Sequence, residues 1–288
     1  MTIVGISRGT EYSPNHIDND AAIFGRVVSI IRDKGYAVEV CTEQEFMAEE
    51  LSPDVVFGMA RNPQVVARLR RLEEAGCLVI NPARGIENCS RRAMTELLIT
   101  HQVAHPHSEI ILLDEEWNTP FYPCWIKRGD SHAIERGDVA YAPTSVEARA
   151  ILADFRSRGI ASAVINEHLQ GDVVKFYGVY DTDFFYWFYP DPRTHSKFGL
   201  EIINGEAREY PFDTTELREL CNRAAAILNV PIYGGDCIVS PDGTLHIIDF
   251  NDWPSFARCR DVAATMIAAY ICERIEVILN RPEYGRNK

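Results

Sequence analysis

YGGDCIVSPDGTLHIIDFNDWPSF, residues 233–256, is the stretch on which the interpretation of the whole chain depends. Two apolar runs flank Pro241-Asp242-Gly243, and turn residues of this kind between apolar runs predict a β-hairpin. Asp236 stands near the start of the first strand, while Asp249 and Asn251 end the second two positions apart, so their side chains point to one face. Oxygen ligands suit a hard cation such as Mg²⁺. The stretch therefore predicts a hairpin that carries a metal site.

Composition excludes several classes of protein. The 288 residues are 46% hydrophobic and 25% charged, which is ordinary for a soluble chain of one large or two medium domains. A net charge of −13 argues against sequence-independent nucleic-acid binding, which depends on basic patches. The sequence has neither a membrane-spanning apolar run nor a secretion signal, so we expect a cytoplasmic protein without a membrane partner. The eight cysteines include no C-x-x-C pair and are expected to be reduced.

The first 82 residues alternate strand-like and helix-like segments. Strands are expected at 3–6, 37–40, 54–57 and 78–80, and helices at 20–34 and 63–75. Such alternation predicts a parallel sheet with helices on its faces. Ligands of these sheets bind beyond the carboxyl ends of the strands, where Arg8 and Arg61 stand. Either arginine can bind a substrate carboxylate or phosphate, and the alternative is a solvated loop arginine.

Residues in the middle of the chain combine basic side chains with a hinge-like segment. A helix is expected at 83–104 with Arg91 and Arg92 near its centre, and an apolar strand at 122–127 ends in Lys127. A strand at 163–172 passes into a polar segment and a glycine turn, and a further hairpin is expected at 173–179 and 184–189. Helices expected at 144–156, 215–229 and 261–279 have the apolar spacing of packing helices. Neither GxGxxG nor GxxxxGK[ST] occurs, which argues against a Rossmann dinucleotide site or a P-loop.

Taken in order, these motifs resemble those of the ATP-grasp family. The hairpin pattern is Asp236, then Asp249-Phe250-Asn251, then Trp253-Pro254-Ser255, with a spacing similar to that of D-alanine:D-alanine ligases. Glutamate ligases that modify ribosomal proteins are similar in the same way. The resemblance implies an N-terminal parallel-sheet α/β domain at 1–84, followed by an α+β ATP-grasp unit at 85–288. In that unit a small lid subdomain at about 105–170 and a large metal-binding subdomain at about 171–288 clamp ATP.

The resemblance also implies roles for individual residues. Those expected to bind the nucleotide are Arg92, Lys127 and Lys197 at the phosphates, Asn166, Glu167 and Leu169 at adenine, and Asp172 at the ribose. Arg91 is a near alternative to Arg92. Those expected to hold two Mg²⁺ ions, for which Mn²⁺ can substitute, are Asp236, Asp249 and Asn251. In the loop after Lys127, His132 departs from the family pattern, and phosphate binding, proton transfer and lid closure are all open to it.

Most members of the family are ligases that join a carboxylate to an amine through an acylphosphate, releasing ADP and phosphate. Lys127, Arg258 and His132 are the expected catalytic residues, and the partners are small-molecule carboxylate and amine substrates, with a homodimer left open. Many such ligases carry arginine two positions before the first metal aspartate, whereas this chain has Gly234. Arg258 or Arg260 can replace that charge. A small-molecule kinase and a non-catalytic ATP-binding regulatory protein are the alternatives.

Overall fold

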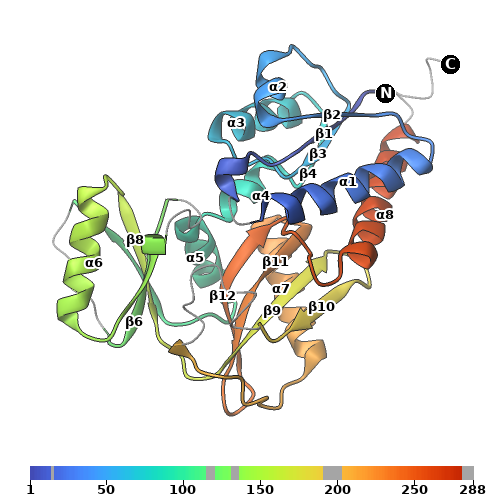
Figure 1. Cartoon of the computed structure of the whole chain (residues 1–288). Helices are drawn as coiled ribbons and strands as arrows, with labels where there is room; N and C mark the ends of the chain where they lie inside the picture. Colours follow the sequence, from blue (N-terminus) through green and yellow to red (C-terminus); the bar gives the residue numbers. More distant parts are fainter. Residues whose placement is uncertain (14–15, 115–120, 131–135, 191–202, 281–288) are drawn as a thin grey trace.

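The computed structural model describes residues 1–13, 16–114, 121–130, 136–190 and 203–280, and these form three four-stranded sheets (Figure 1). An N-terminal sheet lies above two antiparallel sheets, a small one and a large one, which face each other. Two residues with expected roles, His132 and Lys197, lie outside the described ranges.

The N-terminal sheet is parallel, as the alternation of strand and helix predicts. Its strand order is β2-β1-β3-β4, and its strands are β1 (Ile3–Ile6), β2 (Val38–Cys41), β3 (Val55–Gly58) and β4 (Leu78–Ile80). The connecting elements are a 3-10 turn (Thr10–Tyr12) and the helices α1 (Ile17–Asp33), α2 (Glu43–Ala48) and α3 (Pro63–Glu74). Helix α2 was not predicted, although Thr42 and Glu45 form a capping box at its start.

The last helix, α8 (Arg260–Leu279), returns to the N-terminal layer and lies beside α1 (Figure 1). Ile23 and Val27 of α1 share one buried core with Ile267 and Ile271 of α8, and Trp253 at the end of the hairpin lies in the same core. This core contains residues from both sides of position 84, where the sequence predicts a domain boundary. That boundary stays a prediction. None of the described helices is long and apolar enough to cross a membrane.

The large sheet contains the predicted hairpin. Its strand order is β10-β9-β11-β12, and its strands are β9 (Asp172–Val179), β10 (Phe185–Phe188), β11 (Ile232–Val239) and β12 (Leu245–Asp252). The Pro-Asp-Gly turn closes as expected, with the Ser240 backbone N–H donating to the Thr244 carbonyl at 2.9 Å. Apolar side chains on one face pack against α5 (Arg91–Thr100) and α7 (Thr214–Leu228). At one end the opposite face packs Val179 and Ile232 into the core that α1 and α8 share, and farther along it carries Lys175, Asp236 and Asp249.

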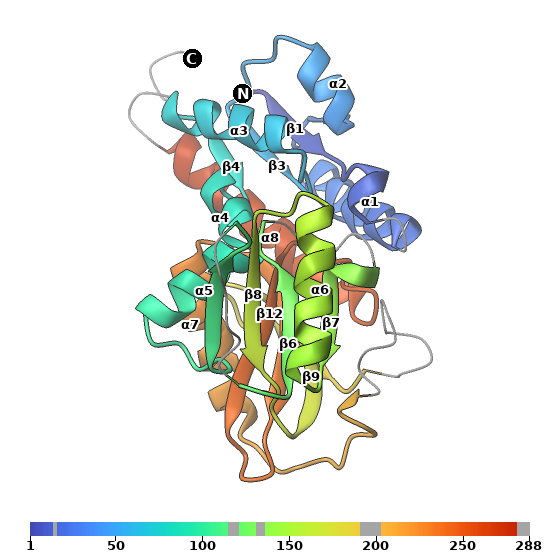
Figure 2. The same ribbon diagram turned by 90° about the vertical axis from the view of Figure 1, so that its left-hand side faces the viewer.

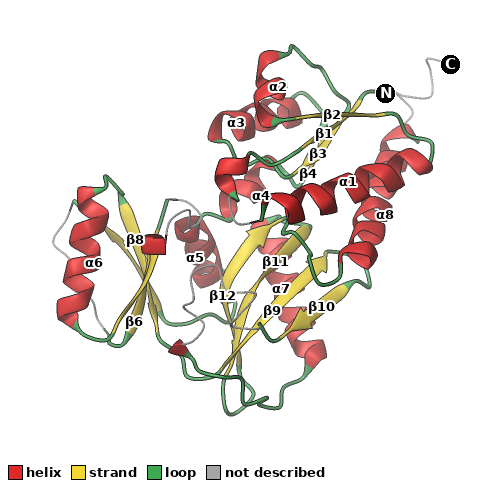
Figure 3. Cartoon of the chain, in the orientation of Figure 1, coloured by secondary structure: helices red, strands yellow, loops and turns green. Residues whose placement is uncertain are grey.

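The small sheet is antiparallel in the order β5-β8-β6-β7. Its strands are β5 (Ser108–Leu112), β6 (Cys124–Arg128), β7 (Val139–Ala142) and β8 (Ser162–Glu167), with a 3-10 turn at Arg136–Asp138. Helix α6 (Ser145–Ser157) buries Leu152 and Phe155 against the outer face of this sheet (Figure 3). Figure 1 shows the small sheet to one side of the large sheet, and Figure 2 shows it in front of β12, so the two antiparallel sheets face each other.

One helix prediction was wrong in its extent. The segment expected as a single helix at 83–104 forms α4 (Ala83–Asn88) and α5, because Ser90 between them is extended. The break lets the Arg92 backbone N–H donate to the Gly129 carbonyl at 2.9 Å, beside the end of β6. The predicted fold class, an α/β domain followed by an α+β unit, is confirmed.

Candidate functional site

A cavity of about 430 Å³ lies between the two antiparallel sheets and beneath the N-terminal loops. It brings together most of the residues singled out in the sequence, although they come from five distant segments. Those that line it are Arg8, Arg61, Lys127, Asn166, Glu167, Leu169, Asp236, Asp249 and Asn251. The structure thus places nine of the expected residues around one space.

The cavity face of the large sheet follows from the two-residue period of its strands. Asp236 on β11 lies directly opposite Asp249 on β12, and Gly234 lies opposite Asn251. The residues between them, such as Phe250, point to the other face and are buried against the helices. The hairpin register therefore groups two carboxylates and an amide on the cavity side.

A β-bulge beside the carboxylates adjusts this arrangement. The register shifts so that Asp236 pairs with Asp249 while Cys237 pairs with Ile247, which leaves Ile248 as the extra residue. Ile248 lines the cavity, and its carbonyl accepts a hydrogen bond from the Lys127 ammonium at 2.7 Å. The bulge thus links the large sheet to β6 of the small sheet.

Lys127 is a buried cation of the site with a perturbed pKa. Its residue exposure is 8%, and burial lowers the pKa of its ammonium to about 8, with Asp249 opposing this shift and Arg91 adding to it. A buried ammonium of this kind gains most from an anion that enters the cavity and replaces water.

Asp236 and Asp249 each contact a basic side chain that was not among the residues expected to form the site. Lys175 on β9 lies opposite Asp236 and donates to its two carboxylate oxygens at 2.9 and 3.1 Å. Arg91 at the start of α5 lies 3.5 Å from an oxygen of Asp249 and has a side-chain exposure of 7%. Lys175 interrupts a largely apolar run in the sequence, which is the signal that could have identified it, whereas Arg91 was expected only as an alternative to Arg92.

Gly234 is required by the packing above the sheet. A Cβ built there meets Cγ of Pro254 and Cδ1 of Tyr177, each at 2.7 Å, and the Phe176 carbonyl oxygen at 2.9 Å. The ring of Tyr177 therefore occupies the space into which a side chain at 234 would extend, and burial raises the pKa of its phenol to about 12. No arginine fits at this position without displacing these groups.

The hinge-like segment forms the opposite end of the cavity. Asn166 is buried and donates through its side-chain amide to the Ser108 hydroxyl at 2.7 Å, while the Leu169 carbonyl accepts from the Asn204 amide at 3.1 Å. Trp125 on β6 lies opposite Asn166, lines the cavity and donates from its indole N–H to Nδ1 of His168 at 3.1 Å. This end is thus bounded by an aromatic ring and by anchored strand ends.

Three expected residues lie outside the cavity lining. Arg92 is exposed on α5 and pairs with Glu96 at 2.8 Å. Asp172 accepts the backbone N–H groups of Arg208 and Tyr210 at 2.8 and 2.9 Å. Arg258 is exposed and places its guanidinium 4.6 Å from the ring centre of Phe188. Arg92 and Asp172 therefore have structural partners, and Arg258 stacks on a ring that itself lines the cavity.

The donor set fits a hard cation that is only partly coordinated by protein. Within the described ranges no group of three or more His, Cys, Asp and Glu side chains is arranged to hold a metal. Asp236 and Asp249, with the Asn251 amide, offer oxygen ligands on one face instead. Such a set suits Mg²⁺, which keeps waters and takes substrate phosphate oxygens to complete its shell.

Comparison by sequence gave no match to a family model or to a curated protein. Comparison of structures gave three informative matches. D-alanine–D-alanine ligase from Bacillus anthracis complexed with ATP matches with a TM-score of 0.65 at 11% identity, over 95% of each chain. The D-alanine–D-alanine ligase from Coxiella burnetii matches with a TM-score of 0.65 at 11% identity, over 96% of this chain and 98% of that one. The ATP-grasp ligase PsnB complexed with minimal precursor matches with a TM-score of 0.58 at 18% identity, over 95% and 99%. The likeness extends over nearly the whole chain, and the protein therefore has the ATP-grasp fold.

Proposed function

We propose that the protein is an ATP- and Mg²⁺-dependent ligase that joins a small-molecule carboxylate to an amine. A substrate carboxylate oxygen attacks the γ-phosphorus of ATP, and the bond to the ADP oxygen breaks. The amine then attacks the acyl carbon, loses a proton, and expels inorganic phosphate. This route makes chemical sense because a free carboxylate is a poor acyl donor until phosphorylation provides a leaving group.

The observation that carries the proposal is the meeting of opposite charges from two sheets in one cavity. Asp236 on β11 and Asp249 on β12 project from the large sheet. The Lys127 ammonium extends from the small sheet to β12, where it lies 2.7 Å from the Ile248 carbonyl. A polyphosphate with bound cations carries the complementary pattern, in which anionic oxygens lie against lysine and cations lie against carboxylates. The B. anthracis ligase that matches this fold is complexed with ATP, which supports the same ligand here.

Each residue has a role that its position supports. Lys127 and Arg91 bind phosphate oxygens, and Asn166, Glu167 and Leu169 bound the adenine end of the cavity. Asp236, Asp249 and Asn251 hold Mg²⁺, which when bound neutralises phosphate charge and orients the transferred group. Mn²⁺ is expected to substitute for Mg²⁺ because it also prefers oxygen ligands.

Lys175 supplies the positive charge that an arginine at position 234 would otherwise provide. It lies on the strand next to Gly234, on the same face, with its ammonium 2.9 Å from Asp236. From there it opposes negative charge that develops on the acyl oxygen during attack by the amine. Arg258 stacks on Phe188 and Arg260 donates to Asn19 at 2.6 Å, whereas Lys175 already lies on the cavity face, so we assign this charge to Lys175.

Binding is tested first by thermal unfolding with and without Mg-ATP. The wild-type protein gains stability by ligand linkage, and Asp249→Ala loses most of that gain while remaining folded. Asp242→Asn is the matched control, because Asp242 lies in the exposed turn of the same hairpin, where it accepts from the Thr244 backbone N–H. If Asp249→Ala gains as much as the control, the metal assignment is wrong.

Chemistry is tested by ADP release against panels of acids and amines, followed by mass measurement of the product. Release that requires both an acid and an amine supports the ligase. A stable phosphorylated product made from one substrate identifies a kinase, the alternative that Gly234 keeps open. Mg-ATP binding without release from any pair identifies a nucleotide-binding regulatory protein.

A further inference from the structure

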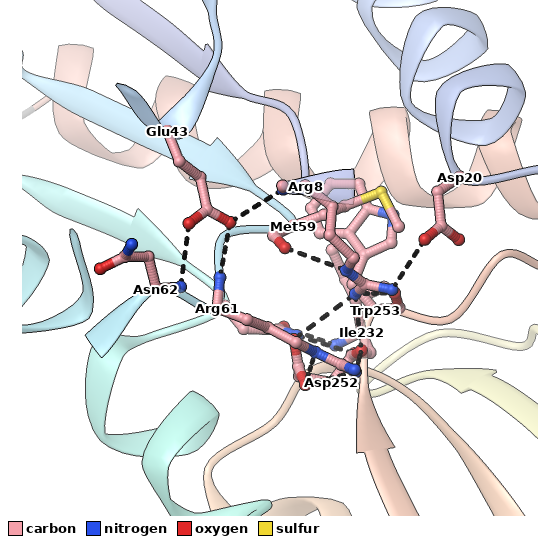
Figure 4. Close-up of polar contacts among 11 residues, drawn as sticks. Arg8, Asp20, Glu43, Met59, Arg61, Asn62, Ile232, Asp252 and Trp253 are labelled. Atoms are coloured by element: carbon pink, nitrogen blue, oxygen red, sulfur yellow. Dashed lines mark hydrogen bonds and ion pairs between the residues drawn. The ribbon is translucent and has the colours of Figure 1, made fainter. Parts of the chain in front are cut away.

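Two arginines expected to bind substrate, Arg8 and Arg61, converge instead on a buried carboxylate, Asp252 (Figure 4). Asp252 is the last residue of β12 and is 1% exposed. Arg61 places Nη2 at 2.9 Å and Nε at 3.1 Å from one carboxylate oxygen, and Arg8 places Nη2 at 3.7 Å from the other. A second carboxylate, Asp20 on α1, lies 3.1 Å from Nη1 of Arg8.

Among the residues that the structure describes, the charges of this network balance. Two guanidinium groups meet two carboxylates, and their side chains are 12% exposed or less. Buried ionic groups are stable only when their partners satisfy them, so an arginine drawn toward a substrate anion would leave an aspartate uncompensated. The network therefore holds both arginines in place at the edge of the cavity.

The same arginines also hold the backbone at the end of β12. Arg61 donates to the Asp252 carbonyl at 3.2 Å, and Arg8 donates to the carbonyls of Asp252 and Trp253 at 3.4 and 2.9 Å. This strand end immediately follows Asn251, and Asp249 lies three residues before Asp252. Loops of the N-terminal sheet thus hydrogen-bond to the end of the strand that carries the expected metal ligands.

A third carboxylate anchors the loops that carry the arginines. Glu43 on α2 accepts the backbone N–H groups of Gly9 and Arg61 at 3.1 and 2.9 Å, and that of Asn62 at 2.9 Å (Figure 4). Arg8 is fixed further by a bond from Nε to the Met59 carbonyl at 3.1 Å. The loops after β1 and β3 are thereby tied to each other before they contact β12.

We propose that Asp252, Arg8 and Arg61 are positioning residues, which fix the end of β12 so that Asp249 and Asn251 bind the metal–nucleotide complex. The inference rests on the proposed function. It assigns the N-terminal sheet a part in metal binding and removes Arg8 and Arg61 from the residues expected to bind a substrate anion. Groups that hydrogen-bond metal ligands typically change metal affinity by about 10- to 100-fold when altered, and we expect these backbone supports to act in the same direction.

The test compares Asp252→Asn with Asp20→Asn. Both variants leave the network with the same excess of positive charge, but only Asp252 lies on the strand of the metal ligands. Mn²⁺ binding in the presence of ATP is measured by electron paramagnetic resonance, with thermal unfolding as a separate readout. We expect both variants to unfold at lower temperature, and Asp252→Asn alone to bind Mn²⁺ about tenfold or more weakly. Equal Mn²⁺ affinity in Asp252→Asn and wild type would overturn the inference.

A second pair of variants covers the case in which Asp252→Asn does not fold. Arg61→Lys keeps the charge but loses the paired N–H geometry, whereas Arg61→Met loses both. We expect Mn²⁺ affinity to fall from wild type to Arg61→Lys to Arg61→Met, and affinities equal to that of wild type would overturn the inference. Failure of the wild-type protein to bind Mn²⁺ with ATP would instead overturn the proposed function, and the inference with it.

Discussion

Lys175 lies opposite Asp236 across neighbouring strands, with its ammonium 2.9 and 3.1 Å from the two carboxylate oxygens. The pair lies on the cavity face. Gly234 and Tyr177, which also lie opposite each other, are two residues away along the same strands. Under the proposed function, Lys175 on β9 supplies the positive charge that the family resemblance leads one to expect from an arginine at position 234. The Tyr177 ring fills the space that such an arginine would need.

Replacing Lys175 tests this substitution. We expect Lys175→Met to lower the rate of acid- and amine-dependent ADP release about 100-fold, the usual cost of losing one group that stabilises developing charge. Lys175→Arg keeps a cation and is expected to stay within about tenfold of wild type. Both side chains of the pair are partly exposed, so thermal stability changes little in either variant. Equal rates in Lys175→Met and wild type would remove Lys175 from the catalytic residues.

Arg91 and Arg92 offer a matched pair of neighbouring arginines. Arg91 is buried 3.5 Å from Asp249, whereas Arg92 is half exposed beside Glu96. We expect Arg91→Met to raise the dissociation constant of Mg-ATP by about tenfold or more, because a buried charge-assisted contact is worth about 1.5–3 kcal/mol. Arg92→Met is expected to remain within about twofold, as for an exposed pair. Isothermal titration calorimetry distinguishes the two, and the reverse order would restore Arg92 to the phosphate site.

A side chain at position 234 is expected to destabilise the protein. Gly234→Ala brings Cβ to 2.7 Å from Pro254 and Tyr177, and overpacking of this kind costs about 1–3 kcal/mol. Urea unfolding gives the change directly. Gly25→Ala is the control, because a Cβ at Gly25 meets nothing within 4 Å and Gly25 lies inside α1, where alanine is favoured. If Gly234→Ala is as stable as Gly25→Ala, the packing argument fails.

The hairpin was predictable because its signals are local. A Pro-Asp-Gly turn and a two-residue period determine that Asp236, Asp249 and Asn251 share a face, and the structure shows this register. The same reasoning could not find the pairing of Lys175 with Asp236. Those residues belong to strands separated in sequence by β10 and α7, and their register depends on tertiary packing.

Other parts of the site were hidden for similar reasons. Arg8 and Arg61 stand where ligands of a parallel sheet bind, so a substrate role followed from topology. Their partner Asp252 is far away in the sequence, so only the structure shows that both arginines contact it. The short strands β5 and β7 lack an alternating pattern strong enough to recognise, because several of their residues are only partly buried.

We expect Lys127 to make nucleotide binding depend on pH in a definite direction. Burial lowers the pKa of its ammonium from 10.5 to about 8, so the folded protein loses this proton at lower pH than the unfolded chain does. Unfolding then takes up a proton between these values, and the contribution of Lys127 to stability rises with pH in that window. A phosphate needs the charged form, so nucleotide affinity changes in the opposite direction. We expect it to be greatest below pH 8 and to fall by up to about tenfold per pH unit above it.

Calorimetry in two buffers with different ionisation enthalpies checks this linkage. At pH 8.5, binding of Mg-ATP should take up protons, because the entering phosphates raise the pKa of Lys127 and restore its charge. At pH 7, where Lys127 is already charged, its contribution to proton uptake should vanish. In Lys127→Met the difference between the two pH values should disappear and affinity should be low at both. If the wild-type protein binds Mg-ATP equally well at pH 7 and pH 9, Lys127 does not contact the phosphates, and its link to Ile248 serves only to hold the two sheets together.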